Sequence, residues 1–328
     1  MKGAHPQASQ NRARFLIALR WIATLIVLAV LFHFLPFDKL REAIAKIPPA
    51  RFLIVLFFYL AAHCIGVLKW RMVVNAAGAS LDLATSAQCY FGGLFGTLFL
   101  PSIVGGDLVR LAVGLRKSPR PAAVLAGNLA DRFLDVTAQA GLVLVGLFLL
   151  PGSLPREWRE RAIPYLLLLI LVGLVCLALA YAIYRAVVKR GSWKVRRRIV
   201  RLRYALRSVK SRPVALVAGW LAGTLIQFTF LVLTALLAIS CGLALPLRVW
   251  LFAWPLAKLA AVVPLTQGGI GVREAALVAL LAPFGAPGAL VLAAGLVWEG
   301  VIISGGLISG AIALILRQSS SSKTMSNE

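Results

Sequence analysis

Charged residues are scarce in this 328-residue chain, and acidic residues are the scarcest of them. Only 14% of the residues are Asp, Glu, Lys or Arg, with 11 acidic against 35 basic side chains, whereas 60% are hydrophobic and the mean hydropathy is +0.89. A soluble domain of this length does not hide so much apolar surface, so the composition indicates an integral membrane protein. The net charge of +24 would suggest nucleic acid in a soluble protein, but in a membrane protein it fits basic cytoplasmic loops. We therefore expect an anionic lipid partner and no nucleic acid.

Residues that bind metals or cofactors are scarce as well. The three histidines are scattered, and the four cysteines lie in or beside apolar runs without the spacing of a metal site or a disulfide framework. The sequence contains no P-loop and no Ser/His/Asp arrangement, and Gly269-Ile-Gly271 is only a fragment of a dinucleotide fingerprint. We therefore expect no metal, no cofactor and no direct use of ATP by this chain.

The sequence does contain one motif twice, P-x3-G-G-x2-V-R, with the copies separated by about half of the chain. The first copy runs from Pro101 to Arg110 and the second from Pro264 to Arg273. Each places an arginine beside a glycine break in an apolar segment. An arginine at bilayer depth costs on the order of 3 kcal/mol or more and by default marks function.

Hydrophobic runs predict an all-α polytopic membrane protein, one integral membrane domain over residues 1–328. Segments 84–115 and 247–285 carry the two motifs, and we interpret them as re-entrant helical hairpins. The alternative has eight full spans, two of them interrupted at a Gly-Gly pair. The six full spans of the favoured topology are expected near residues 15–35, 52–74, 121–150, 163–184, 213–241 and 286–316.

The distribution of basic residues predicts the orientation. Residues 185–212 contain twelve Lys or Arg and no acidic residue, so we place this basic loop in the cytoplasm. Counting spans from there puts both termini on the cytoplasmic side of the cell (inner) membrane, and the Ser-rich tail 317–328 is expected to be disordered. The halves, about 15–150 and 163–316, then have three crossings each and form an inverted repeat whose hairpin tips meet near mid-membrane, as in transporters.

The two motif copies form the first candidate site. If the tips reach mid-membrane, the helices that begin after the glycine pairs point their N-termini at its centre, together with Arg110 and Arg273. Helix N-termini and guanidinium groups suit a phosphate. The competing interpretation is that the glycines serve tight packing and that Asp107 caps its helix and pairs with Arg110.

Polar residues of the span 121–150 form the second candidate site. Asn128, Asp131, Asp135 and Gln139 share one helix face, with Arg132 beside them. This face is either a cavity wall or proton relay, or a buried polar network that fixes the span to the hairpin. In contrast, Lys69 and Arg71 are expected to extend to the membrane interface.

The residues described so far resemble those of a known family. Phe99–Arg110, then Asp131-Arg132, then Pro264–Glu274 are similar to the lysylphosphatidylglycerol synthase transmembrane region, also called the flippase-like family, over about residues 15–316. In the best-known members this region moves an aminoacylated phospholipid across the bilayer and is fused to a cytosolic aminoacyl-transfer domain. The present sequence ends without that domain, so the resemblance implies lipid handling rather than synthesis of lysylphosphatidylglycerol.

The sequence therefore favours a lipid translocase that binds a phosphate-containing headgroup between the hairpin tips and has no catalytic residue. The two motif arginines would hold the phosphate, and the aspartates would engage an amine or balance charge. Two alternatives stay open: a membrane-embedded transferase acting on a lipid phosphate, and a non-catalytic membrane partner of a separate lipid-modifying enzyme. The residues expected to bind the substrate are Gly105, Gly106, Asp107, Arg110, Asp131, Arg132, Asp135, Gly268, Gly269, Arg273 and Glu274.

Overall fold

The computed structural model describes residues 37–100, 104–150, 185, 193–261, 266 and 270–325. Within these ranges every regular element is a helix, which confirms the predicted all-α class. In chain order the elements are α2 (Phe37–Ala45), α3 (Pro49–Ala76), α4 (Leu83–Thr97), α5 (Val104–Lys117), α6 (Pro121–Leu149), α8 (Trp193–Lys210), α9 (Pro213–Ser240), α10 (Leu247–Ala260), α11 (Val272–Leu281), the short 3-10 helix η1 (Ala282–Phe284) and α12 (Gly288–Met325).

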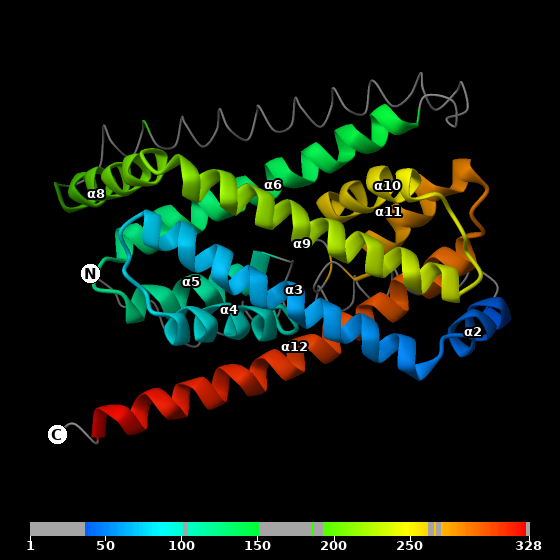
Figure 1. Ribbon diagram of the computed structural model, residues 1–328, viewed down its shortest axis with the longest axis horizontal. Coiled ribbons are helices and arrows are strands. Elements are labelled where there is room, and N and C mark those ends of the chain that lie inside the picture. The colour runs from blue at the N-terminus through cyan, green and yellow to red at the C-terminus, as the bar shows by residue number, and fades with distance from the viewer. Residues whose placement is uncertain are drawn as a thin grey trace, which may run out of the picture.

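Four of the described helices are long and apolar enough to cross a membrane: α3, α6, α9 and residues Gly288–Gln318 of α12. A 28-residue helix is about 42 Å long and exceeds the roughly 30 Å hydrocarbon core. All four run along the long axis of the molecule (Figure 1). The chain is thus a multi-pass membrane protein; its predicted spans 15–35 and 163–184 lie outside the described residues.

Helix boundaries follow local signals in the sequence. Pro49, Pro121 and Pro213 each occupy the first turn of a long helix, where a missing N–H costs no hydrogen bond. Asp82 is the N-cap of α4 and accepts a hydrogen bond from the Thr85 backbone N–H at 3.3 Å. These signals explain why the observed boundaries of α3, α4, α6 and α9 lie within a few residues of the predicted ones.

Helices α4 and α5 form an antiparallel hairpin. Residue numbers fall along one helix as they rise along the other, and with 15 and 14 residues each helix is only about 21–23 Å long. Neither helix alone is therefore long enough to cross the hydrocarbon core. Three pairs that face each other define the register: Cys89 with Gly114, Gly93 with Arg110, and Thr97 with Gly106.

The described helices of the second half repeat the order of those in the first, with α8–α12 following the pattern of α2–α6. Helix α6 packs on α10 and α8, and α12 packs correspondingly on α4 and α2. Figure 1 shows α3 and α9 side by side and running in opposite directions, with α2 and α8 at opposite ends of the bundle. Each short helix pair is thus held by the long helix of the other half.

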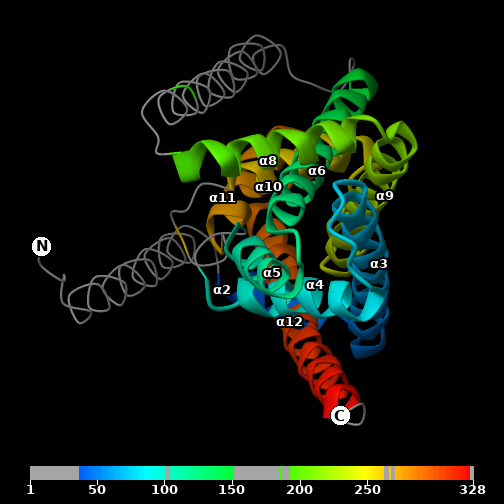
Figure 2. The ribbon, with the colours of Figure 1, turned by 90° about the vertical axis from the view of Figure 1, so that its left-hand side faces the viewer.

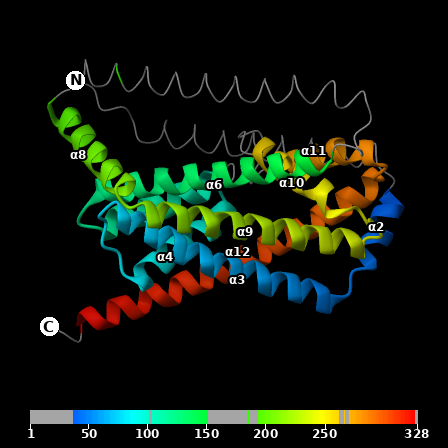
Figure 3. The same cartoon turned by 45° about the horizontal axis from the view of Figure 1, so that its top comes forward.

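Three details differ from the sequence predictions. Helix α5 begins at Val104, before the glycine pair rather than after it, because Gly106 packs closely on α4 within the first helical turn. The basic stretch contains helix α8, which lies at an angle across one end of the bundle (Figure 3). Helix α12 continues to Met325, through most of the tail expected to be disordered, since no Gly or Pro interrupts residues 311–325. Its last turns project from the bundle (Figure 2).

Candidate functional site

A neutral cluster of three cations and three carboxylates lies between α3, α5 and α6. Asp131 is at its centre, only 1% exposed, and its carboxylate lies 2.8 Å from Lys69 Nζ. The same carboxylate lies 3.3 Å from Arg110 Nη2 and 3.1 Å from Arg132 Nη2. Asp107 pairs with Arg110 at 2.9 Å and with Arg132 at 3.3 Å. Every charge in the cluster therefore has a partner of opposite sign.

Lys69 is part of this cluster and does not extend to the interface as the sequence predicted. It is 5% exposed and pairs with both Asp131 and Asp135. Gly223 of α9 covers the pair so closely that a Cβ there would lie 3.1 Å from the Asp135 carboxylate. The expectation failed because Lys69, although close to the end of α3, faces the carboxylates of α6, which a hydropathy profile does not indicate.

The polar face predicted on α6 points into the protein. Asn128, Asp131, Asp135 and Gln139 are all buried. The Asn128 side chain accepts a hydrogen bond from Trp70 Nε1 at 3.1 Å, and Arg110 lies over the rings of Trp70 and Tyr90 at 5.4 and 5.3 Å. This arrangement matches the interpretation of the face as a buried polar network that fixes the span to the hairpin.

The second motif arginine has an equivalent set of partners. Arg273 in the first turn of α11 pairs with Glu274 of the same helix at 2.6 Å and with Glu299 of α12 at 2.7 Å. Glu274 is fully buried and also accepts the backbone N–H of Gly271 at 2.7 Å. Gly271 has a φ of +84°, which disfavours any residue with a side chain. In both halves, then, the arginine joins a hairpin helix to the long helix that follows it.

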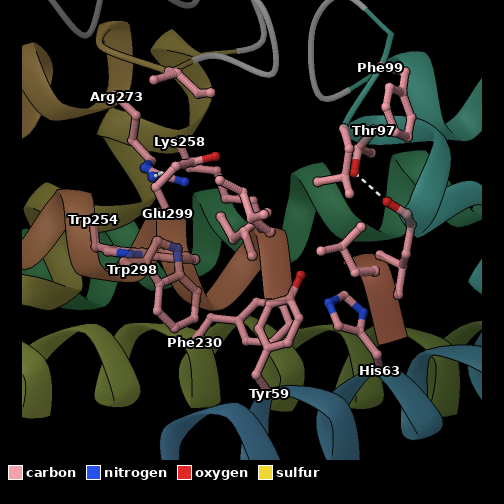
Figure 4. Close-up of a pocket in the computed structure, with 16 residues that line it drawn as sticks. Tyr59, His63, Thr97, Phe99, Phe230, Trp254, Lys258, Arg273, Trp298 and Glu299 are labelled. Carbon is pink, nitrogen blue, oxygen red and sulfur yellow. Dashed lines mark hydrogen bonds and ion pairs between the residues drawn. The ribbon is translucent and has the colours of Figure 1, made fainter. Parts of the chain in front are cut away.

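A cavity of about 400 Å³ lies where the two helix pairs approach each other. From the first pair it is lined by the end of α4 and the residues that follow, Thr97 to Phe99. From the second it is lined by Lys258 in the last turn of α10 and by Arg273. Described residues near the ends of both helix pairs therefore face one cavity, with α3, α9 and α12 closing its sides (Figure 4).

The charged side chains of the cavity gather toward one end. Lys258, Arg273 and Glu299 lie together, opposite Thr97 and Phe99 (Figure 4). His63 enters from α3; its Nδ1 is hydrogen-bonded with the Tyr90 hydroxyl at 3.3 Å, whereas its buried Nε2 has no partner in the described part of the chain. The cavity thus offers a cation, an ion pair and one unsatisfied ring nitrogen to a ligand.

Apolar and aromatic residues form the rest of the lining. Tyr59, Phe230 and Trp298 are in mutual ring contact, with centroids 5.3 to 5.8 Å apart, and are at most 6% exposed. Phe99, Ile303 and Leu307 also line the cavity, yet they are 58%, 43% and 54% exposed. These three residues mark an apolar mouth, so the cavity combines a group of charged side chains with an apolar entrance.

The residues expected to bind the substrate are divided among three places. Arg273 lines the cavity, with Glu274 packed behind it. Asp107, Arg110, Asp131, Arg132 and Asp135 belong to the neutral cluster and do not line the cavity, while Gly105 and Gly106 lie in the first turn of α5. Gly268 and Gly269 lie outside the described residues.

The expected set omits the remaining polar residues of the cavity. The cavity is also lined by His63, Lys258 and Glu299, which lie far apart along the chain. The available signal was a lone charge in an apolar run, which Lys258 and Glu299 both present.

Fold and site together define a polytopic helical membrane protein with two pairs of short helices around an amphipathic cavity. The model of the lysylphosphatidylglycerol synthase transmembrane region matches residues 14–310. The chain therefore belongs to this family, as its motifs suggested, and to membrane proteins associated with lipid modification or flipping. No curated protein and no solved structure matches the chain.

Proposed function

We propose that the protein is a lipid translocase that holds a phosphate-containing headgroup in the cavity between the hairpin tips while the acyl chains remain in the bilayer. The observation that carries this proposal is the amphipathic lining, with Lys258 and Arg273 at one end and exposed apolar residues at the other. A volume of about 400 Å³ lies within the range of small-molecule sites. A lipid headgroup bound in this cavity is removed from water, but it does not have to enter the hydrocarbon core of the bilayer.

We further infer that the two helix pairs are re-entrant hairpins of an inverted repeat. Short helices, an antiparallel first pair and the exchanged packing of the two halves support this topology. The first hairpin then enters from the cytoplasm and the second from outside, with both termini cytoplasmic in the cell membrane. Irregular backbone at membrane depth is tolerated where it is buried in protein or lines a cavity.

Labelling of single cysteines tests this topology. In a cysteine-free background, Ala84→Cys and Pro119→Cys, at the two ends of the first hairpin, should react from the cytoplasm. Ala244→Cys and Pro287→Cys, at the ends of the second, should react from outside; all four sites are exposed. A pair that divides between the two sides would make its segment a full span and remove the inverted repeat.

A sidedness assay in liposomes tests the function. Purified protein should move a fluorescent phospholipid from the inner to the outer leaflet, where a membrane-impermeant reagent quenches it. Leu94→Trp fills part of the cavity and should abolish this movement, because Leu94 lies in its wall. Leu129→Trp makes the same exchange on the 49% exposed outer face of α6 and should leave movement intact.

The same liposomes separate the alternatives. Mass spectrometry of the recovered lipid would show a new covalent product if the protein is a transferase. No movement and no product would leave the role of a non-catalytic partner, and the translocase proposal would have to be given up. Equal movement by both tryptophan variants would show that lipid does not pass through this cavity.

A double-mutant cycle tests whether the two motif arginines share one headgroup. Arg110 and Arg273 have no common partner in the described structure, so the effects of Arg110→Gln and Arg273→Gln on lipid affinity should add within about 0.5 kcal/mol. A coupling of about 1–3 kcal/mol would instead place both guanidinium groups on one ligand.

We also propose that α8 lies in the headgroup layer of an anionic leaflet. Its sequence has eight Lys or Arg and no acidic residue, and Trp193, Val200 and Tyr204 are exposed by 63–78% on one face. Amphipathic basic helices bind anionic interfaces in this way. Replacing Arg197 and Arg201 by Gln should reduce the stabilisation that phosphatidylglycerol gives over phosphatidylcholine in nanodiscs; an unchanged difference would refute this contact.

A further inference from the structure

We propose that Lys258, rather than either motif arginine, is the residue that selects an anionic phosphate in the cavity. This inference rests on the proposed function, since it assigns the recognition residue of the same site. The three cations differ in how far the protein itself neutralises their charge. Lys258 belongs to neither motif, and it comes from the last turn of α10.

Both motif arginines are occupied by the protein itself. Arg110 has Asp107 and Asp131 within 3.3 Å, and it does not line the cavity. Arg273 does line the cavity, but both of its carboxylate partners lie within 2.7 Å. A phosphate that approached Arg273 would also approach Glu299, and the repulsion would cancel much of the attraction.

Among the residues that the structure describes, Lys258 is the cavity cation that lacks a counter-ion. Within the described structure no carboxylate oxygen lies within 4.0 Å of its Nζ. Its Nζ donates to Gln227 Oε1 at 2.7 Å and lies 5.1 and 5.5 Å from the ring centroids of Trp254 and Phe230. Neutral and aromatic partners stabilise a half-buried ammonium only in part, so a ligand that brings negative charge gains most there.

His63 adds a second recognition group to the same cavity. It is 7% exposed, and its Nε2 has no hydrogen-bond partner among the described residues. Figure 4 shows its ring directed into the cavity from α3. Because the neighbouring Tyr90 hydroxyl already contacts Nδ1, the Nε2 position is free to bond a ligand oxygen. In the described structure neither Lys258 nor His63 has a carboxylate within ion-pair distance, and Glu299 of the same cavity is already paired with Arg273.

The shared ligand chemistry is a phosphate, which a lipid headgroup and free inorganic phosphate could both supply. The mouth formed by Phe99, Ile303 and Leu307 favours the lipid, because these exposed side chains match acyl chains rather than water. The experiment therefore uses three probes: short-chain phosphatidate, diacylglycerol with the same chains, and inorganic phosphate.

Binding of each probe is measured on detergent-solubilised full chain by native mass spectrometry and by the shift in melting temperature. Wild-type protein should prefer phosphatidate over diacylglycerol. Lys258→Gln should weaken phosphatidate binding at least about tenfold, as expected when a charged hydrogen bond is removed, with diacylglycerol binding unchanged within about twofold. Lys258→Arg keeps the charge and should restore most of the preference.

Two further variants separate recognition from folding. Lys117→Gln removes an exposed cation of α5 and should leave the preference for phosphatidate unchanged. Arg273→Gln should lower the melting temperature, because it leaves two buried carboxylates unpaired, yet its folded fraction should still prefer phosphatidate. Without lipid, Lys258→Gln should melt no lower than Lys117→Gln, whereas a lysine with a purely structural role would lower the melting temperature.

The possible outcomes test the assignment of Lys258, the lipid as its ligand and the translocase function separately. An unchanged preference in Lys258→Gln, or its loss in Arg273→Gln but not in Lys258→Gln, overturns the assignment of Lys258. Equal affinity of the wild type for phosphatidate and diacylglycerol overturns it too, and inorganic phosphate binding as tightly as phosphatidate would replace the lipid by the free ion. Lysine-dependent phosphatidate binding without movement in liposomes would refute the translocase and leave this inference intact.

Discussion

Neutralising Asp131 should destabilise the fold more than removing any exposed charge. Its carboxylate, 1% exposed, lies within 3.3 Å of Lys69, Arg110 and Arg132. Asp131→Asn leaves three cations with two carboxylates in a place where water cannot compensate. Breaking a buried ion pair on one side costs about 3–5 kcal/mol, and the 39% exposure of Arg132 favours the lower end.

The assay is unfolding in mixed micelles with increasing sodium dodecyl sulfate, followed by helical circular dichroism. Lys46→Gln is the control, since it removes an i,i+4 pair with Glu42 whose side chains are 57% and 66% exposed. Such pairs contribute about 0.3–0.5 kcal/mol. The expected order is therefore a large loss for Asp131→Asn and a loss near the error of the measurement for Lys46→Gln.

A compensating variant tests the reason for the loss. Adding Lys69→Met to Asp131→Asn restores equal numbers of cations and carboxylates in the cluster. The double variant should be more stable than the sum of the single effects by about 0.5–3 kcal/mol. If Asp131→Asn unfolds like the wild type, or if the two effects simply add, the cluster does not behave as one electrostatic unit and this reasoning fails.

Two further predictions concern the first hairpin. Gly106→Ala would place a Cβ 2.5 Å from a backbone oxygen of α4 and should lower the free energy of unfolding by about 1–3 kcal/mol in the same assay. The control is Gly92→Ala, whose Cβ would have no atom within 4 Å. It should be neutral or stabilising by up to about 1 kcal/mol. Asp82→Ala should cost about 1 kcal/mol. Hydrogen bonds from Thr85 lower the pKa of Asp82, so the stabilisation is present at neutral pH and lost as pH falls through that pKa. The melting temperatures of the wild type and of Asp82→Ala should therefore converge at acidic pH.

Much of the architecture follows from local sequence signals. Proline at the start of α3, α6 and α9 and the long apolar runs place these helices within a few residues of the observed boundaries. The repeated motif correctly indicated a helix start near Gly271. It misplaced the start of α5, because the glycine pair there serves interhelical packing rather than a chain break.

The site was harder to predict because its residues meet only through tertiary packing. The arginines of the two motifs look equivalent in the sequence, yet only Arg273 lines the cavity. Whether an arginine is neutralised depends on a carboxylate of the next long helix, Asp131 or Glu299, more than 20 positions away. Periodicity gives the face of a helix but not the neighbour that the face contacts, so Lys69 was placed at the interface.

For the translocase proposed above, the separation of neutralised arginines from a lysine without a counter-ion has a physical consequence. Hairpins too short to cross the membrane need strong attachments, and the Arg–carboxylate pairs supply them without adding net positive charge near the tips. An arginine without a carboxylate partner would bind a phosphate tightly through its two parallel hydrogen bonds. One cation stabilised by an amide and two aromatic rings attracts a phosphate more weakly than a bidentate arginine. Moderate affinity at the midpoint is what a carrier requires if it is to release its lipid on the other side.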